Sequence, residues 1–369
     1  MKIEKLKEQV KMVSEPRRDS HGNFVHSLES ILIIGLVSIL CGGQDYVGME
    51  TLGKSKYEWL SGFLDLTSGI PDSDTFRRVF ERVKEEELAK CLDGWISDEK
   101  GAVKAVAIDG KTIRGSGNAE HKPYHVVSAW AGANGITLGQ VVVDEKSNEI
   151  KAISEILDVI DVSGAVVTID AIGCQKSIAA KLIEAGAEYI LALKPNHKNL
   201  FKQVKARFDE IDSGNATICL DKYEESVNGL GRIEKREYTV ISADLFSDKE
   251  KWQGMKTVVR CRFTSLKDGK EIVTGRFYLS SLPANARRFS KLIRDHWSIE
   301  NQLHWVLDVV FEEDASRARK NHSPLNMNVL RKTALRLLLN VKTARVSFKK
   351  LMFRAALEQN FLELILSGG

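Results

Sequence analysis

The spacing of hydrophobic and polar positions divides the chain into regions with different periods. Up to about residue 98, apolar residues recur with a helical period, as in SLESILIIGLVSIL and YEWLSGFLDL. The stretch PDSDTFRRVFERVKEEELAKCLDGWI adds one or two helices, with Asp72, Ser73 or Asp74 available as the N-cap residue. The pattern therefore predicts a helical N-terminal region.

From residue 102 the pattern alternates between strands and helices. VKAVAID, HVVSAWA and ITLGQVVVDE predict three strands, and Gly132-Ala133-Asn134-Gly135 predicts the hairpin turn between the last two. NEIKAISEILDVI and QKSIAAKLIEAGA predict helices, and SGAVVTIDAIG and AEYILALKPN predict the strands that follow them. Three antiparallel strands followed by helix, strand, helix and strand predict a mixed sheet with helices on its faces. This is the order of a ribonuclease H-like α/β fold.

The second half of the chain changes pattern twice. Residues 200–214 predict a helix, and four strand-like runs follow up to residue 282, the last two joined by a turn at Lys267-Asp268-Gly269-Lys270. ARRFSKLIRDHWSIENQLHWVLDVVF and SPLNMNVLRKTALRLLLNVK then predict two long helices. The expected domains are a helical N-terminal domain (1–98), the first part of an α/β core (99–214), a β-rich insertion (215–285), the C-terminal helices of the core (286–345) and a C-terminal helix or tail (346–369).

Composition narrows the class of protein only a little. With 369 residues and 43% hydrophobic content, the chain is long enough for two or three domains with a sizeable core. The net charge is +4, but from Arg287 onward there are 15 Lys and Arg against 8 Asp and Glu. A basic C-terminal third is compatible with a polyanionic partner such as nucleic acid, and equally with solvated helix faces.

Cysteines and apolar runs indicate a cytoplasmic protein with no membrane segment. The five cysteines are widely spaced and include no C-x-x-C pair, which argues against a disulfide framework or a zinc site. The most apolar stretch, ILIIGLVSILCGG, is too short to span a membrane. We expect it to form a buried helix that ends at Gly42-Gly43. An α/β-hydrolase is excluded because the chain has no G-x-S-x-G motif.

Two apolar strands are expected to end in an acid. Asp109 follows AVAI and Asp170 follows VVTI. Asp109-Gly110 is also a common turn pair, so a plain strand-ending turn is the alternative. If the two strands are adjacent, the carboxylates lie side by side, where their repulsion is relieved by a cation between them. A pair of Mg²⁺ ions on such oxygen ligands supports phosphoryl chemistry, and we expect Gly110 to leave space for a metal and a phosphate.

The best candidate for a third acid is Glu300 in HWSIENQLHW. In a regular helix Glu300 shares one face with His296 and His304, four residues to either side. A solvent-exposed glutamate is the alternative, and Asp308, Glu312, Glu313 and Asp314 compete for the role. The two histidines could instead bind zinc, but no matching Cys/His set exists elsewhere. Trp297 and Trp305 could stack on a flipped base, although aromatics on an apolar helix face are expected in the core.

These motifs resemble a known family. AIDGKTIRGS, VVTIDAIGCQ, YILALKPNHKNL and HWSIENQLHWVLDVVFEEDASRARK are similar to stretches of the H-repeat-associated (ISAs-type) insertion-sequence transposases. EPRRDSHGNFVHSLESIL and GIPDSDTFRRVFERV resemble the N-terminal domain of the same family, so the similarity runs from about residue 15 to 340.

The resemblance implies a DDE transposase with a ribonuclease H-like catalytic domain and a β-rich insertion before the last acid. Asp109, Asp170 and Glu300 would be the first, second and third acids and the ligands of two Mg²⁺ ions, with Mn²⁺ as a substitute. The partners would be double-stranded DNA, both element terminal repeats and target DNA, bound by a homodimer or higher oligomer. No small-molecule substrate is implied, and the protein would be bacterial and associate with the nucleoid when bound to DNA.

The chain departs from related transposase groups around the last acid. Those groups place Tyr, Arg and Lys at −7, −4 and +7, where this chain has Ile293, His296 and Leu307. It also has Leu230 where a histidine is expected, and LKPNHK in place of a more usual Lys-Gly-Asn-Gln. Contacts to DNA phosphates must therefore come from other basic residues. The candidates are Lys111, Arg114, Lys194, Arg294, Arg317, Arg319 and Lys320.

Two classes of function follow from these residues. The first is an enzyme that cuts DNA at element ends and joins the freed 3′ hydroxyl to target DNA, with a nuclease that cuts without joining as a close variant. The second is a domesticated or inactive copy that binds DNA without cleaving it. The three acids favour the enzyme, whereas the departures at Leu230 and Leu307 favour the inactive copy.

Overall fold

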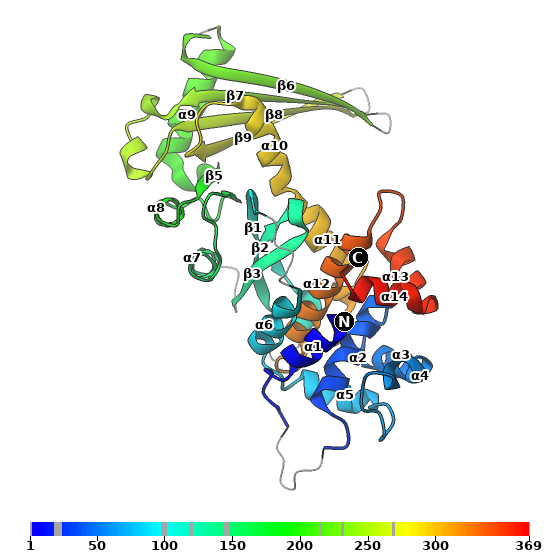
Figure 1. The fold of residues 1–369 in the computed structure, drawn as a ribbon. Helices are drawn as coiled ribbons and strands as arrows, with labels where there is room; N and C mark the ends of the chain where they lie inside the picture. The colour runs from blue at the N-terminus through cyan, green and yellow to red at the C-terminus, as the bar shows by residue number, and fades with distance from the viewer. Residues whose placement is uncertain are drawn as a thin grey trace. The chain divides into compact units, whose positions relative to one another are not determined.

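The chain forms two compact units, each assembled from separate segments (Figure 1). The structure is a computed structural model that describes residues 2–17, 24–96, 102–117, 121–143, 148–214, 216–229, 232–267 and 270–368. One unit contains Met1–Gly101, Thr112–Tyr124 and Leu303–Gly369; the other contains Ala102–Lys111 and His125–Gln302. Leu230 and the tip of the expected turn at Asp268-Gly269 lie outside the described residues.

The first unit is helical. Its helices are α1 (Lys2–Val10), α2 (Leu28–Leu40), α3 (Tyr46–Ser55), α4 (Tyr57–Ser61), α5 (Ser73–Phe80), α6 (Glu85–Ile96), α11 (Trp305–Val309), α12 (Ser323–Val341), α13 (Phe348–Leu357) and α14 (Gln359–Leu366). Helix α12 packs against α2, α5 and α6, which brings the C-terminal part of the chain into one core with the N-terminal helices. The expectation of a helical N-terminal region is confirmed for the described residues.

Helix α2 shows how sequence determines structure in this unit. Ser27 caps its N-terminus by accepting a hydrogen bond from the Ser30 amide, and almost every residue of the helix is buried. The helix ends before Gly42, whose φ of 94° is open to glycine at little cost. The apolar stretch is therefore a buried core helix, as predicted. Asp72 is the N-cap of α5, one of the three residues predicted for that role.

The second unit is built on one nine-stranded sheet. Its strands are β1 (Ala105–Thr112), β2 (His125–Ala131), β3 (Ile136–Val143), β4 (Val166–Ile169), β5 (Glu188–Leu193), β6 (Cys219–Gly229), β7 (Arg232–Ser242), β8 (Thr257–Lys267) and β9 (Lys270–Ser280). Their order in the sheet is β3-β2-β1-β4-β5-β9-β8-β7-β6. The β1–β4 and β4–β5 pairs are parallel, whereas β2–β3, β5–β9 and the pairs among β6–β9 are antiparallel. The expected mixed sheet is confirmed.

Helices cover both faces of this sheet because its central strands carry apolar residues on both sides. Helices α7 (Glu149–Val159), α8 (Lys176–Glu184) and α9 (Lys198–Asp212) share one core with alternate residues of the sheet, such as Val167 and Leu191. Helix α10 (Ala286–His296) shares a separate core with the intervening residues, such as Val166 and Ile190. Figure 1 shows α10 passing beside the sheet after β9.

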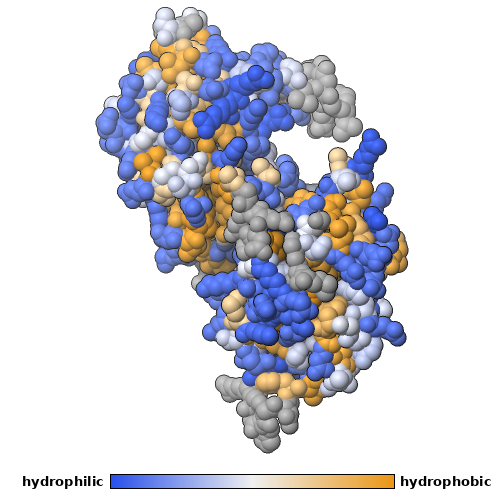
Figure 2. Space-filling model, viewed as in Figure 1, coloured by the Kyte–Doolittle hydropathy of each residue, from blue (hydrophilic) through white to orange (hydrophobic). Residues whose placement is uncertain are grey.

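Among the described residues, no helix has both the length and the apolar character needed to cross a bilayer. The face seen in Figure 2 is largely hydrophilic, with hydrophobic residues in separate smaller patches.

Candidate functional site

The first two candidate acids, Asp109 and Asp170, lie next to each other along the neighbouring strands β1 and β4. Strands β1 and β4 pair in parallel, and the last residues in register are Ile108 and Ile169. Asp109 and Asp170 directly follow this pair, so the expected placement on adjacent strands is confirmed. The sequence predicted that strand β1 stops at Asp109, but the strand continues to Thr112. The Asp-Gly pair is therefore not a strand-ending turn.

Asp109 lies in an environment that disfavours its charged form. Burial raises the pKa of its carboxyl to about 7, and the negative charges of Asp170, Glu300 and Glu149 add to the rise. A backbone hydrogen bond from Gly110 opposes it. The Asp170 carboxylate accepts a hydrogen bond of 2.9 Å from the Ile172 amide. Asp170 and Glu300 therefore both act electrostatically on Asp109.

Glu300 lies in an irregular part of the predicted long helix. Helix α10 ends at His296, and Ile299–His304 forms a π-helical turn before α11. A π-helical turn bonds residue i to i+5, so side chains four apart do not stack as in an α-helix, and such turns are frequent at functional sites. The expected common face of His296, Glu300 and His304 is therefore wrong. Glu300 is exposed.

His296 instead points inward and joins the elements that carry the acids. Its Nδ1 lies 2.9 Å from Thr168 Oγ1 on β4, and the Thr168 hydroxyl donates a 3.3 Å hydrogen bond to the Val106 carbonyl on β1. Burial lowers the pKa of His296, with the charge of Asp170 opposing this effect. One hydroxyl thus connects β1, β4 and the end of α10. No spacing in the sequence links Thr168 to His296.

The space beside Gly110 is filled by protein. A Cβ on Gly110 would overlap with His125 Nε2 and lie 2.6 Å from Glu149 Oε1. These two side chains form an ion pair of 2.5 Å and are almost fully buried. The expectation that Gly110 leaves room for a metal and a phosphate is therefore wrong. Neither His125 nor Glu149 stood out in the sequence, because they are far apart in the chain.

The competing acids of the first unit have other partners. Glu313 is fully buried 3.8 Å from Arg331, and the Asn328 amide donates to it at 2.8 Å. Glu312 forms an ion pair of 3.5 Å with Lys349. Asp314 lies 3.7 Å from Arg114 Nε. These contacts give Glu312, Glu313 and Asp314 a structural role, so their presence does not require a catalytic one.

The structure separates the basic candidates into groups. In the first unit, Arg319 Nε donates a 3.1 Å hydrogen bond to the Gly115 carbonyl, and Arg114 pairs with Asp314. These contacts bring the turn Arg114–Ser116 against the turn Glu313–Ala315, and a Cβ on Gly115 would lie 2.6 Å from the Ser316 carbonyl. Close backbone packing thus requires glycine at position 115.

The remaining basic candidates lie elsewhere. In the second unit, Lys194 is exposed at the end of β5, Lys111 is half-buried on β1, and Arg294 Nη1 lies 3.3 Å from both carboxylate oxygens of Glu225. In the first unit Lys320 is exposed.

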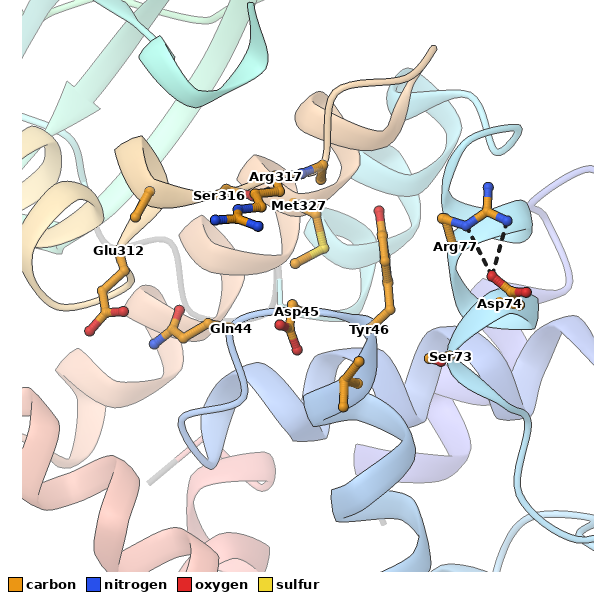
Figure 3. A pocket seen from close by; sticks show the side chains of 13 residues that line it. Gln44, Asp45, Tyr46, Ser73, Asp74, Arg77, Glu312, Ser316, Arg317 and Met327 are labelled. Carbon is orange, nitrogen blue, oxygen red and sulfur yellow. Dashed lines mark hydrogen bonds and ion pairs between the residues drawn. The ribbon is translucent and has the colours of Figure 1, made fainter.

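Arg317 lines a pocket in the first unit (Figure 3). The pocket has a volume of about 500 Å³, and Tyr46, Arg77, Glu312 and Met327 also contribute to its wall. Figure 3 shows Arg317 and Met327 on one side of the pocket and Arg77, held by Asp74, on the other. The lining carries both acids and bases, so it does not single out a ligand.

The two tryptophans are not core residues, contrary to expectation. Trp297 is 38% exposed, and the Arg276 guanidinium lies 4.4 Å from its ring centroid. Trp305 is 55% exposed. The apolar face expected for this helix is interrupted where the π-helical turn begins.

The donor chemistry of the acids suits a hard divalent cation. Carboxylate oxygens are the ligands that Mg²⁺ and Mn²⁺ prefer, and the raised pKa of Asp109 shows that its surroundings disfavour the negative charge. Among the described residues, no three Asp, Glu, His or Cys side chains are gathered closely enough to hold an ion. The residues therefore fit the ion by the type of their donor atoms.

Comparisons with known proteins cover most of the chain. Residues 103–337 match the family described as "Transposase DDE domain", and residues 7–96 match the family described as "DDE_Tnp_1-associated". Two similar proteins come from Escherichia coli (strain K12). "H repeat-associated putative transposase YhhI" is 32% identical over 381 residues, and "Putative protein YbfL" is 32% identical over 378 residues. Both alignments cover 100% of this chain and 99% of the relative.

A third relative comes from another strain. "Putative transposase YncI" of Escherichia coli O157:H7 is 34% identical over 376 residues, which cover 100% of this chain and 95% of the relative. The similarity therefore includes both the helical unit and the sheet.

Proposed function

The chain belongs to the family of DDE-domain transposases, and we propose that it cuts DNA at the ends of an insertion element and transfers the freed strands to target DNA. The observation that carries this proposal is that two other candidate acids act electrostatically on the buried carboxyl of Asp109. Burial and the charges of Asp170 and Glu300 raise the pKa of Asp109 to about 7. Groups held in this way are typical of sites that bind a cation or transfer protons.

The proposed catalytic core is ribonuclease H-like. Support comes from the chain order β1-β2-β3-α7-β4-α8-β5 and from the sheet order β3-β2-β1-β4-β5. Strands β6–β9 would be the insertion that precedes the third acid, since they extend the same sheet beyond β5 and the chain returns through α10.

Asp109, Asp170 and Glu300 are the proposed ligands of two Mg²⁺ ions, with Mn²⁺ as a substitute. When bound, such a pair of ions activates an attacking water or hydroxyl and neutralises charge on the leaving oxygen. Asp109 must give up any proton on its carboxyl before it can serve as a ligand, which makes metal affinity depend on pH. Thr168 and His296 hold β1, β4 and α10 in register beneath the acids.

Double-stranded DNA is the proposed substrate, and a homodimer or higher oligomer is the proposed active form. Neutralising phosphates releases counterions, so binding should weaken as salt is raised. In the first unit, Arg114, Arg317, Arg319 and Lys320 are candidate contacts and belong to two packed turns and the segment that follows them. Lys111, Lys194 and Arg294 are proposed contacts on the second unit, and Arg294 would have to leave Glu225 to reach a phosphate.

The test uses the purified full chain and labelled DNA fragments that carry candidate element ends. We expect nicking with Mg²⁺ or Mn²⁺, none with EDTA, and joined products when target DNA is added. Asp109→Ala, Asp170→Ala and Glu300→Ala should each lower the cleavage rate at least about a thousandfold, which corresponds to about 4 kcal/mol of barrier.

Asp295→Asn is the matched control for Glu300. Asp295 is an exposed acid on α10, five residues before Glu300. The Asp295→Asn variant should cut DNA at the wild-type rate. DNA binding without cleavage in either metal would instead identify an inactive copy that binds DNA.

A further inference from the structure

A buried ion pair lies directly against the residue that follows the first acid. His125 begins β2 and Glu149 begins α7, and their side chains meet with Nε2 and Oε1 2.5 Å apart. The side chains are only 4% and 7% exposed. Burying a carboxylate beside another polar group is costly, and a hydrophobic pair would often serve stability as well. The pair therefore needs an explanation beyond packing.

The contact with Gly110 supplies that explanation. A Cβ at position 110 would overlap with His125 Nε2 and approach Glu149 Oε1 to 2.6 Å. The ion pair thus lies against the backbone of β1 one residue beyond Asp109. Any shift of either side chain is transmitted to this backbone, because there is no intervening side chain to absorb it.

The contact also restrains its own members. Both side chains are almost fully buried, and their facing atoms, His125 Nε2 and Glu149 Oε1, lie 2.5 Å apart. This contact therefore limits the direction in which the Glu149 carboxylate can point.

We propose that the His125–Glu149 pair is a positioning element for Asp109, which it acts on through the backbone of Gly110. It holds β1 at Asp109 so that the Asp109 carboxylate stays close to Asp170, which directly follows β4. Asp109 is the acting ligand, and His125 and Glu149 work only through it. The inference rests on the proposed function, since it assigns a purpose to a residue next to a proposed metal ligand.

A purely structural role makes a different prediction. If the pair only stabilised the fold, its loss would lower the melting temperature, and the molecules that remain folded would bind metal and cut DNA normally. A positioning role predicts weaker metal binding and slower cleavage in folded protein. Groups that orient metal ligands typically change metal affinity or activity roughly 10- to 100-fold when they are mutated.

The experiment measures Mn²⁺ affinity, DNA affinity in EDTA and cleavage rate at saturating DNA, all on the full chain. Glu149→Ala and Gly110→Ala should each weaken Mn²⁺ binding about tenfold or more and slow cleavage roughly 10- to 100-fold, with DNA affinity within about twofold of wild type. Glu149→Gln keeps an acceptor for His125 and should recover most of the loss. This conservative variant also gives a result if Glu149→Ala does not fold.

A double variant tests the contact itself. Gly110→Ala should be damaging in the wild-type background and cause little further loss when Glu149 is already alanine, because the two changes disturb the same contact. The matched control is Gly275→Ala on β9, where the added Cβ meets no other atom within 4 Å. This control should leave Mn²⁺ affinity and cleavage unchanged.

The possible results separate this inference from the proposed function. If Asp109→Ala abolishes Mn²⁺ binding and cleavage but Glu149→Ala and Gly110→Ala behave as wild type, the positioning role is wrong and the proposed function stands. A lower melting temperature with normal metal affinity and cleavage in the folded fraction also overturns the positioning role alone. If wild type neither binds Mn²⁺ through Asp109 nor cuts DNA, the proposed function fails, and the positioning role fails with it.

Discussion

Each of the two units withdraws an acid from water, and the surroundings of the two acids differ in charge. In the helical unit, Glu313 is fully buried, lies 3.8 Å from Arg331 and accepts a hydrogen bond from Asn328. In the sheet unit, Asp109 is half-buried, and the charges that shift its pKa are those of other carboxylates. The first arrangement holds helices together. The second disfavours ionisation in the folded chain, as is typical of a binding site.

The largest expected effect on stability concerns Glu313, the buried acid beside Arg331. Arg331→Met leaves the Glu313 charge buried without its cation, so the free energy of unfolding should fall by about 3–5 kcal/mol. Denaturant unfolding followed by circular dichroism measures the change. Adding Glu313→Gln to the same chain should recover part of the loss, because no charge then remains. A single variant within about 1 kcal/mol of wild type would show that the pair contributes little.

For Asp109, which lies near other carboxylates, removing the charge should raise the free energy of unfolding. The pKa of Asp109 rises from its ordinary value of 3.8 to about 7 on folding, so the folded chain binds a proton more tightly than the unfolded chain. Its carboxylate therefore lowers stability progressively as pH rises from about 4 to 7. Asp109→Asn should stabilise the metal-free protein at pH 8. The shift sets an upper limit of about 4 kcal/mol, and solvent screening reduces the expected gain to on the order of 2 kcal/mol.

Thermal and denaturant unfolding in EDTA at pH 5 and pH 8 checks this sign. The gain should shrink at pH 5, where most Asp109 carboxyls in the folded wild-type protein are already protonated. Asp295→Asn, an exposed acid on α10, should show no such gain. An equal gain at both pH values would contradict the assignment, since it could not come from the ionisation of Asp109.

The third prediction concerns backbone packing in the helical unit. Gly115→Ala places a Cβ 2.6 Å from the Ser316 carbonyl, which cannot rotate away as a side chain can. The turns Arg114–Ser116 and Glu313–Ala315 must then separate, and stability should fall by about 1–3 kcal/mol. Denaturant unfolding measures this loss against Gly275→Ala on β9, where the added Cβ meets no other atom within 4 Å. Equal costs for both alanines would mean that the turns are not closely packed.

The smallest effect is expected at the hydroxyl that joins β1, β4 and α10. Thr168→Val keeps the shape of the side chain and removes the hydrogen bonds to Val106 and His296, at a cost of about 1 kcal/mol. Denaturant midpoints resolve a change of this size. Thr168→Ser retains the hydroxyl and should keep both hydrogen bonds. If valine is as stable as threonine, the elements under the acids are held by packing alone.

Sequence patterns predicted the parts of the fold that depend on neighbouring residues. The period-2 runs indicated β1 to β5, and the acid-tipped runs placed Asp109 and Asp170 on adjacent strands because parallel strands carry like ends at one edge. The buried helix α2 followed from its continuous apolar run, its N-cap and its glycine stop. The boundaries of the expected domains and the roles of the acids stay predictions.

Features set by tertiary contacts were not predictable in this way. The π-helical turn at Ile299–His304 has no period of its own in the sequence, so the sequence predicts a regular helix at Glu300 and a core position for Trp297. His125 and Glu149 meet only because β2 and α7 pack side by side. The sequence predicts space for a metal and a phosphate beside Gly110, because the side chains that fill this space come from distant parts of the chain.

The shared core of the helical unit has a consequence for gene decay. Helix α12 is buried along most of its length and packs against α2, α5 and α6, which come from the first hundred residues. A copy of the gene that lost its 5′ end would encode α12 without these partners and expose its apolar side chains to water. Such a fragment should aggregate or be degraded. Truncation at this end would therefore leave no folded helical unit, even where the 3′ part of the gene is intact.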